Sequence, residues 1–207
     1  MKKIPLILVC LCLFASPVYA LSAAIQAVVG ASSAPAGCSA STDYVGDKSD
    51  LSAGTTATSP DVYFCISYQA ITSSCSSGTL GAAYIAHHLD STQSVKMAVY
   101  TDSTSGTGAP NGESRIGDAA SLTCSTDTPT PTCTNGSDLG GTVDKDAYYF
   151  LCIIGTTAGF DYHRVTTGRT VYYKGFTGGY ATPVDTLTAT GWSDGGTRDR
   201  GAYVEIK

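Results

Sequence analysis

The sequence predicts an all-β protein, built as a two-sheet antiparallel β-sandwich. Three observations lead to this fold class: apolar runs with two-residue alternation recur, stretches rich in Gly, Pro and Ser separate them, and the composition favours strands. The 207 residues include 23 Gly and 13 Tyr, and only 14% are charged. Aromatic residues suit the half-buried surface of a sheet, so this balance is typical of extracellular β proteins.

The N-terminus has the pattern of a secretory signal. Lys2 and Lys3 precede an apolar run, and residues 16–20 end in the small-x-small pattern that signal peptidase cleaves. The run is shorter than the roughly 20 apolar residues of a membrane-spanning helix. We therefore expect a signal peptide over residues 1–20 and a secreted protein of the extracellular cell surface, with no membrane span.

The mature chain has the size of one domain and a negative charge. Loss of Lys2 and Lys3 with the signal lowers the basic residues from 12 to 10 against 17 acidic ones, a net charge of −7. Such a surface repels phosphate backbones, which argues against nucleic acid as a partner. The sequence predicts an apolar arm over residues 21–37 and one β-sandwich domain over residues 38–207.

The arm, LSAAIQAVVGASSAPAG, is uncharged and has two interpretations. One is a flexible lead-in or a first strand of the sheet. The other is a donor strand that adds to the open edge of a neighbouring subunit and so builds a filament. The residues that would make that contact are the apolar ones: Leu21, Ile25, Val28 and Val29.

The six mature cysteines predict three disulfides and no metal site. Cys124 and Cys133 flank a short Pro-Thr loop that a local bridge would close. Cys65 and Cys152 each lie within an apolar run, which favours a bridge between neighbouring strands or sheets. Cys38 and Cys75 then remain as the third candidate pair. The chain contains no Cys-x-x-Cys spacing for zinc or haem, and we expect no cofactor.

The two-residue alternation of apolar residues predicts the strands of the domain, which we describe in chain order. We expect residues 61–70 to form a strand, with one face made up of Val62, Phe64, Ile66 and Tyr68. Residues 80–87 and 95–101 follow, and we expect them to pair as a central hairpin across residues 90–93. A Gly/Pro-rich loop lies after Tyr100, at one end of the sandwich.

The next strand, residues 146–156, is apolar on both parities. This pattern predicts a central position in its sheet, with both faces covered.

Six segments follow one another in a recurring order of strands and loops: VKMAVYTD (95–102), GAPNG (108–112), SRIGD (114–118), DAYYFLCII (146–154), TVYYK (170–174) and AYVEI (202–206). Together they resemble jelly-roll-like β-sandwich modules of bacterial secreted and surface proteins. The resemblance covers roughly residues 60–207. It implies a jelly-roll type of sandwich and a carbohydrate-binding or adhesive role.

Aromatic residues gather after residue 160. Rings in end loops or on an exposed sheet face would stack on sugars, and the same rings also serve as core. Three of them are candidates for glycan stacking: Trp192, Tyr180 and Tyr173. Glycines flank Trp192, so we expect it to be the most exposed.

No catalytic arrangement is predicted. Residues 191–195, Gly-Trp-Ser-Asp-Gly, match the spacing of a nucleophile elbow, but no His follows Ser193 and no helix begins there. His87 and His88 are adjacent and point to opposite faces of a strand. The leading hypothesis is a non-catalytic structural subunit that partners itself; the alternative is a glycan-binding or adhesive module, and a secreted enzyme is the remote third.

Overall fold

The structure is a computed structural model that describes residues 37–48, 55–57, 60–73, 75–86, 93–124, 133–155 and 161–207. These residues belong to one compact unit, Gly37–Lys207. The side chains of residues 55–57, 93, 124, 161–167 and 198–200 lie outside the description. The predicted signal peptide and the arm with Leu21, Ile25, Val28 and Val29 also lie outside the described residues.

The described chain is all-β, as predicted, and forms two antiparallel sheets. The strands are β1 (Tyr44–Gly46), β2 (Thr55–Ala57), β3 (Val62–Gln69), β4 (Ser77–Ile85), β5 (Gln93–Thr101), β6 (Arg115–Cys124), β7 (Cys133–Thr134), β8 (Thr142–Asp144), β9 (Tyr148–Gly155), β10 (Asp161–Gly175), β11 (Ser193–Arg200) and β12 (Ala202–Ile206). The smaller sheet has the order β1-β12-β4-β7, with β8 also paired to β4. The larger has the order β11-β10-β3-β9-β5-β6, with β2 paired to β10.

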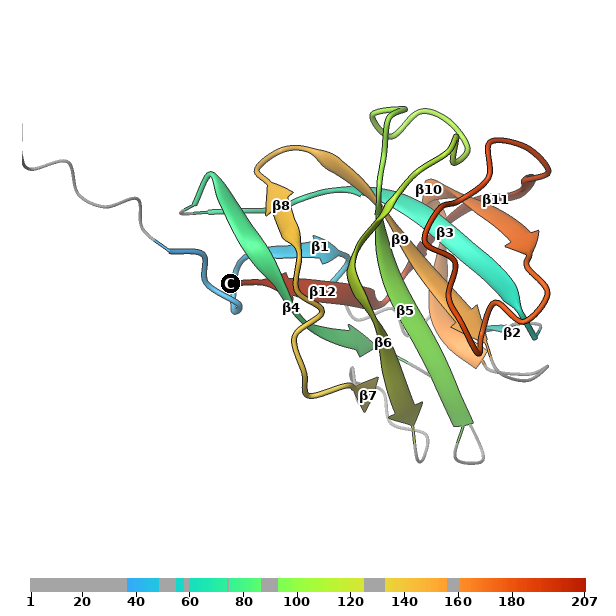
Figure 1. The fold of residues 1–207 in the computed structure, drawn as a ribbon, viewed down its shortest axis with the longest axis horizontal. Coiled ribbons are helices and arrows are strands. Elements are labelled where there is room, and N and C mark those ends of the chain that lie inside the picture. Colours follow the sequence, from blue (N-terminus) through green and yellow to red (C-terminus); the bar gives the residue numbers. More distant parts are fainter. Residues whose placement is uncertain are drawn as a thin grey trace, which may run out of the picture. The chain divides into compact units, whose positions relative to one another are not determined.

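Strand β9 lies at the centre of the seven-stranded sheet, between β3 and β5 (Figure 1). Its residues Phe150 to Gly155 are all buried. Alternate side chains therefore enter two different apolar layers, which explains why both parities of this segment are apolar. The central position predicted for it is confirmed.

The predicted hairpin of β4 and β5 is wrong. β4 pairs with β12 in the five-stranded sheet, whereas β5 lies between β6 and β9 in the seven-stranded sheet. Both segments nevertheless contribute to one core, since Ala83 and Ile85 of β4 lie in it together with Val95 and Met97 of β5. Alternation specifies a buried face and leaves the partner strand open, so two strands facing each other across the sandwich fit the same pattern.

The main core fills the space between the two sheets. On β3, β5 and β9 it takes one parity, and its members include Ile66 of β3, Leu151 of β9 and Val204 of β12. All three are at most 2% exposed. Burial of this apolar layer is the principal stabilisation of the sandwich.

A second apolar layer covers the outer face of the seven-stranded sheet. It takes the opposite parity, with Tyr63 of β3, Tyr100 of β5 and Phe150 of β9. Residues 176–192, which we call the strap, run between β10 and β11 and supply Phe176 and Leu187 to this layer. The strap thus allows the seven-stranded sheet to be apolar on both faces.

Candidate functional site

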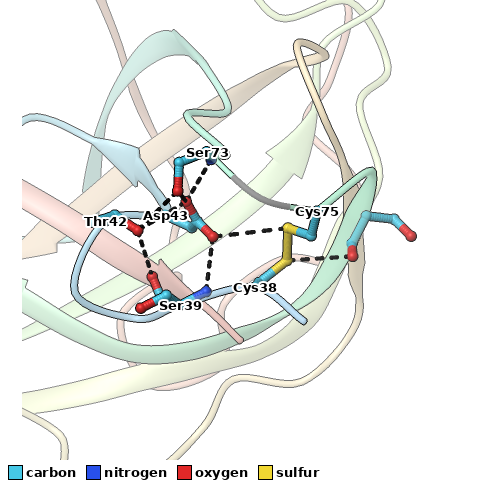
Figure 2. The surroundings of a disulfide bond; sticks show 7 residues. Cys38, Ser39, Thr42, Asp43, Ser73 and Cys75 are labelled. Atoms are coloured by element: carbon cyan, nitrogen blue, oxygen red, sulfur yellow. Dashed lines mark hydrogen bonds between the residues drawn. A yellow bond between two sulfur atoms is a disulfide. The ribbon is translucent and has the colours of Figure 1, made fainter. Parts of the chain in front are cut away.

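The first cluster lies where the described chain begins. A disulfide joins Cys38 to Cys75, with 5.0 Å between their Cα atoms, and the carboxylate of Asp43 lies beside it (Figure 2). Oδ2 of Asp43 accepts a hydrogen bond from the Ser39 amide at 2.8 Å. Oδ1 accepts from the amide and hydroxyl of Ser73 at 2.6 and 2.8 Å, and from the Thr42 hydroxyl at 3.2 Å. Asp43 therefore joins the segment before β1 to the β3–β4 connection.

Asp43 is fully buried and nevertheless charged at neutral pH. Burial by itself raises the pKa of this carboxyl, but the hydrogen bonds from Ser39, Ser73 and Thr42 outweigh it and hold the pKa below its ordinary value. The two sulfur atoms and the Asp43 carboxylate lie close enough to surround a metal ion. The two sulfurs are bonded to each other, however, whereas zinc is ligated by free thiolates. We therefore interpret this cluster as a structural cross-link between the two segments.

The second disulfide joins Cys65 of β3 to Cys152 of β9, which are direct cross-strand neighbours. Both cysteines are fully buried in the layer beneath the strap. Cys133 is also disulfide-bonded and buried. The side chain of Cys124, its predicted partner, lies outside the described residues. The two described pairs are those that the sequence predicts.

Two further carboxylates organise the loop between β5 and β6. Asp102 accepts hydrogen bonds from the Thr104 amide at 2.7 Å, from the Gly106 amide at 3.0 Å and from the hydroxyl of Ser67. Glu113 is 3% exposed and accepts from Thr101 and Ser103. Carboxylates that receive this many donors stabilise a loop conformation, and their lone pairs are already used.

Hydrogen bonds from the sheet hold the strap in place. Asp61, in a left-handed conformation with φ of 57°, accepts from the amides of Gly178 and Tyr180 at 3.0 and 2.8 Å. The buried Tyr63 hydroxyl donates to Gly179 O at 3.0 Å and accepts from the Val184 amide at 2.9 Å. These bonds fix the part of the strap nearest β3.

The strap also reaches the edge of the sheet at β6. The Arg115 amide donates to Asp185 O and the Leu187 amide donates to Glu113 O, both at 2.8 Å. An ion pair of 2.7 Å between Arg115 and Asp185 reinforces this contact. The strap therefore crosses the outer face of the seven-stranded sheet from β10 to β6.

Two of the three predicted glycan-stacking residues belong to the strap. Trp192 is half-buried, packs against Phe176 with ring centres 5.9 Å apart, and donates Nε1–H to Thr188 O at 2.8 Å. Tyr180 is also half-buried, and the Lys96 ammonium lies 5.0 Å from its ring centre. Both rings thus pack against the second apolar layer, so the prediction that Trp192 is the most exposed of the three is wrong.

Tyr173 has a different environment. It is 39% exposed and lies on the opposite face of β10 from Tyr172, which packs beneath the strap. Its ring lies over Gly195 of β11, so close that a Cβ there would come within 3.3 Å of the ring. The Phe64 ring lies 6.1 Å away at an interplanar angle of 29°. The structure does not bring Tyr173 together with Trp192 and Tyr180.

A row of tyrosines on the outer face of the five-stranded sheet was not singled out from the sequence. Tyr203 of β12 stacks on Tyr84 of β4, with ring centres 4.8 Å apart, and meets the edge of Tyr44 of β1. The Lys48 ammonium lies 4.7 Å from the Tyr203 ring centre. The faces of these rings are therefore in contact with one another and with the Lys48 ammonium. Only the register of three strands would have revealed this row.

The sheet edges differ in how they are covered. β6 is bridged by the strap and by Leu139, whose carbonyl accepts from the Asp118 amide at 2.7 Å. At β1, Tyr44 exchanges two backbone hydrogen bonds with Ile71. β11 is the outermost strand of the seven-stranded sheet and pairs with β10 on its inner side.

A shallow polar hollow of about 300 Å³ lies between β6 and residues 135–139. Its polar side chains include Asp138 and Asn135. Asp138 pairs with Lys207 at 2.6 Å, and Asn135 is held by hydrogen bonds to Ala83 and Ser137. These groups fasten the β7–β8 connection to the sheet.

Comparison with known proteins finds no counterpart. No protein-family model matches the chain, and neither the curated proteins nor the solved structures contain a match. Within the described residues, no helix has the length and apolarity to cross a membrane.

Proposed function

We propose that this chain is an exported, non-catalytic structural subunit of the cell surface, which assembles with copies of itself by strand addition. The apolar arm of residues 21–37 would leave one copy and pair with the edge strand β11 of the next. Main-chain hydrogen bonds supply the affinity in this mode of association, and alternate side chains supply specificity.

The observation that carries the proposal is the position of β11. It is an eight-residue strand at the end of the larger sheet, paired with β10 on one side. The strap and Leu139 bridge β6 at the other end of that sheet, and Ile71 bridges β1 in the smaller sheet. A row of main-chain donors and acceptors at a sheet edge is a template for another strand.

The hydrogen bonds that the carboxylates of this domain accept support a structural role. Asp43, Asp61, Asp102 and Glu113 each accept main-chain hydrogen bonds that fasten a loop. The two described disulfides add covalent links within the same domain. Such cross-links are typical of proteins that persist in an oxidising environment outside the cell.

Light scattering and negative-stain microscopy test this proposal. The oxidised chain that begins at Leu21 should form regular polymers, whereas a chain that begins at Cys38 should remain a folded monomer. A polymer formed without the arm, or a monomer formed with it, would contradict strand addition.

Tyr173 favours a second candidate function, glycan binding. Its side chain is 39% exposed, and an exposed aromatic ring is a surface on which a sugar can stack. On a glycan array, Tyr173→Ala should abolish binding and leave the unfolding midpoint nearly unchanged. Trp192→Ala is the contrasting variant, because the half-buried Trp192 packs on Phe176 and its loss should lower stability.

A further inference from the structure

Both asparagines of the sequence are followed by glycine. The pairs are Asn111–Gly112, in the loop between β5 and β6, and Asn135–Gly136, just after β7. An Asn-Gly pair is prone to cyclise, because glycine places no side chain in the way of its own amide nitrogen. The structure gives the two pairs opposite surroundings.

At Asn135, each group that cyclisation requires is already hydrogen-bonded. Nδ2 of Asn135 donates to Ser137 O at 2.6 Å, and Oδ1 accepts from the Ala83 amide at 2.9 Å. The Gly136 amide donates to the Thr134 hydroxyl at 3.2 Å. To react, this pair must break three hydrogen bonds and turn the side chain away from β4.

At Asn111, the same groups have no such bonds. Asn111 and Gly112 are both exposed. Within the described part of the chain, neither the Asn111 amide group nor the Gly112 N–H has a hydrogen-bond partner. Gly112 adopts φ of 83°, and a Cβ built on it would meet nothing within 4 Å. The pair is nevertheless flanked by two buried residues, Pro110 and Glu113.

We propose that Asn111 is a site of spontaneous deamidation in the folded protein, and that Asn135 is protected. The Gly112 nitrogen, after loss of its proton to solvent base, attacks Cγ of Asn111. The new C–N bond closes a succinimide ring as the bond to Nδ2 breaks, and the nitrogen leaves as ammonia. Water then opens the ring at either carbonyl, which gives aspartate or isoaspartate. No oxidant or enzyme is required.

The position of the site gives the modification a structural consequence. Isoaspartate adds one methylene to the main chain at position 111, three residues before Ser114 and four before the start of β6. The intervening Glu113 holds Ser103 through its carboxylate and the strap residue Leu187 through its carbonyl. Deamidation therefore adds a negative charge and loosens the junction between the β5–β6 loop and the strap.

Peptide mapping by mass spectrometry tests the proposal. The oxidised chain is incubated at mildly alkaline pH, and the mass gain from exchange of an amide for a carboxylate is followed at both sites. Asn111 should react at least about tenfold faster than Asn135, since the latter must first open locally. Equal rates, or a faster reaction at Asn135, would overturn the proposal.

Two controls separate structure from sequence. In urea with reduced disulfides, the two pairs should react at similar rates; a difference that persists there would show that neighbouring residues, not the fold, determine it. Asn111→Ser should remove the fast reaction. Thr134→Val frees the Gly136 amide and should accelerate the reaction at Asn135, and an unchanged rate would contradict protection through that bond.

Discussion

The carboxylate of Asp43 accepts hydrogen bonds from both the amide and the hydroxyl of Ser73, at 2.6 and 2.8 Å, across 30 residues of sequence. The Cys38–Cys75 disulfide spans the same two segments (Figure 2). One buried charge and one covalent bond thus fasten the segment before β1 to the β3–β4 connection.

We predict that Asp43→Asn destabilises the domain by about 3 kcal/mol. The side-chain amide of the asparagine would point its NH₂ group at the main-chain amide of Ser39 or Ser73. Because both of these groups are donors, a hydrogen bond would be lost. Urea unfolding monitored by circular dichroism measures the loss. Asp118→Asn, at an exposed position, is the matched control and should change the midpoint little.

The stability that Asp43 contributes should depend on acid pH. Because its folded pKa lies below the ordinary 3.8, the contribution is complete above that pH and is lost as the pH falls through the folded pKa. The difference in unfolding free energy between the natural chain and Asp43→Asn should therefore narrow at acid pH. A constant difference down to about pH 2 would show that the charge is not responsible.

Alkaline pH should release the strap. Burial raises the pKa of both Tyr63 and Tyr100, whose hydroxyls bond the strap at Gly179 and Val184. Their stabilising effect is complete below the ordinary value of 10.0 and declines as the pH rises above it, since the unfolded chain then loses protons that the folded domain keeps. Thermal unfolding at increasing pH, with tyrosinate absorbance as a second signal, measures this. Tyr63→Phe should weaken the decline, and an unchanged decline would contradict this explanation.

The two described disulfides should differ in their sensitivity to reductants. Cys65 and Cys152 are fully buried beneath the strap, whereas Cys38 is only half-buried. A reductant added to the folded protein should therefore open Cys38–Cys75 first, as alkylation and mass spectrometry would reveal. Removal of either bridge should cost about 4 kcal/mol, because both close long loops. Faster reduction of Cys65–Cys152 would mean that the strap opens readily.

Local pattern was sufficient to predict the fold class and several strands. The double-sided apolar character of β9 correctly predicted its central position. Of the four residues that were assigned to one face of β3, Ile66 and Tyr68 lie in the main core and Phe64 packs against it, whereas Val62 is not part of it. The candidate pairs Cys38–Cys75 and Cys65–Cys152 agree with the structure. The jelly-roll type stays a prediction.

Features that depend on pairing across the sandwich were not predictable. The alternation of β4 and β5 carries no information about which sheet each joins, so the hairpin was wrong. The strap has the composition of an ordinary loop, and only its hydrogen bonds to Asp61, Tyr63 and Glu113 reveal that it covers a sheet face. The stacked pair of Tyr84 and Tyr203 likewise depends on register.

The most direct test of strand addition is hydrogen exchange on the domain of residues 38–207 with a synthetic peptide of residues 21–37. The account predicts that the peptide binds and slows exchange at the main-chain amides of β11, and that a scrambled peptide of the same composition does not. Protection confined to another strand, or no binding by the peptide, would contradict the account.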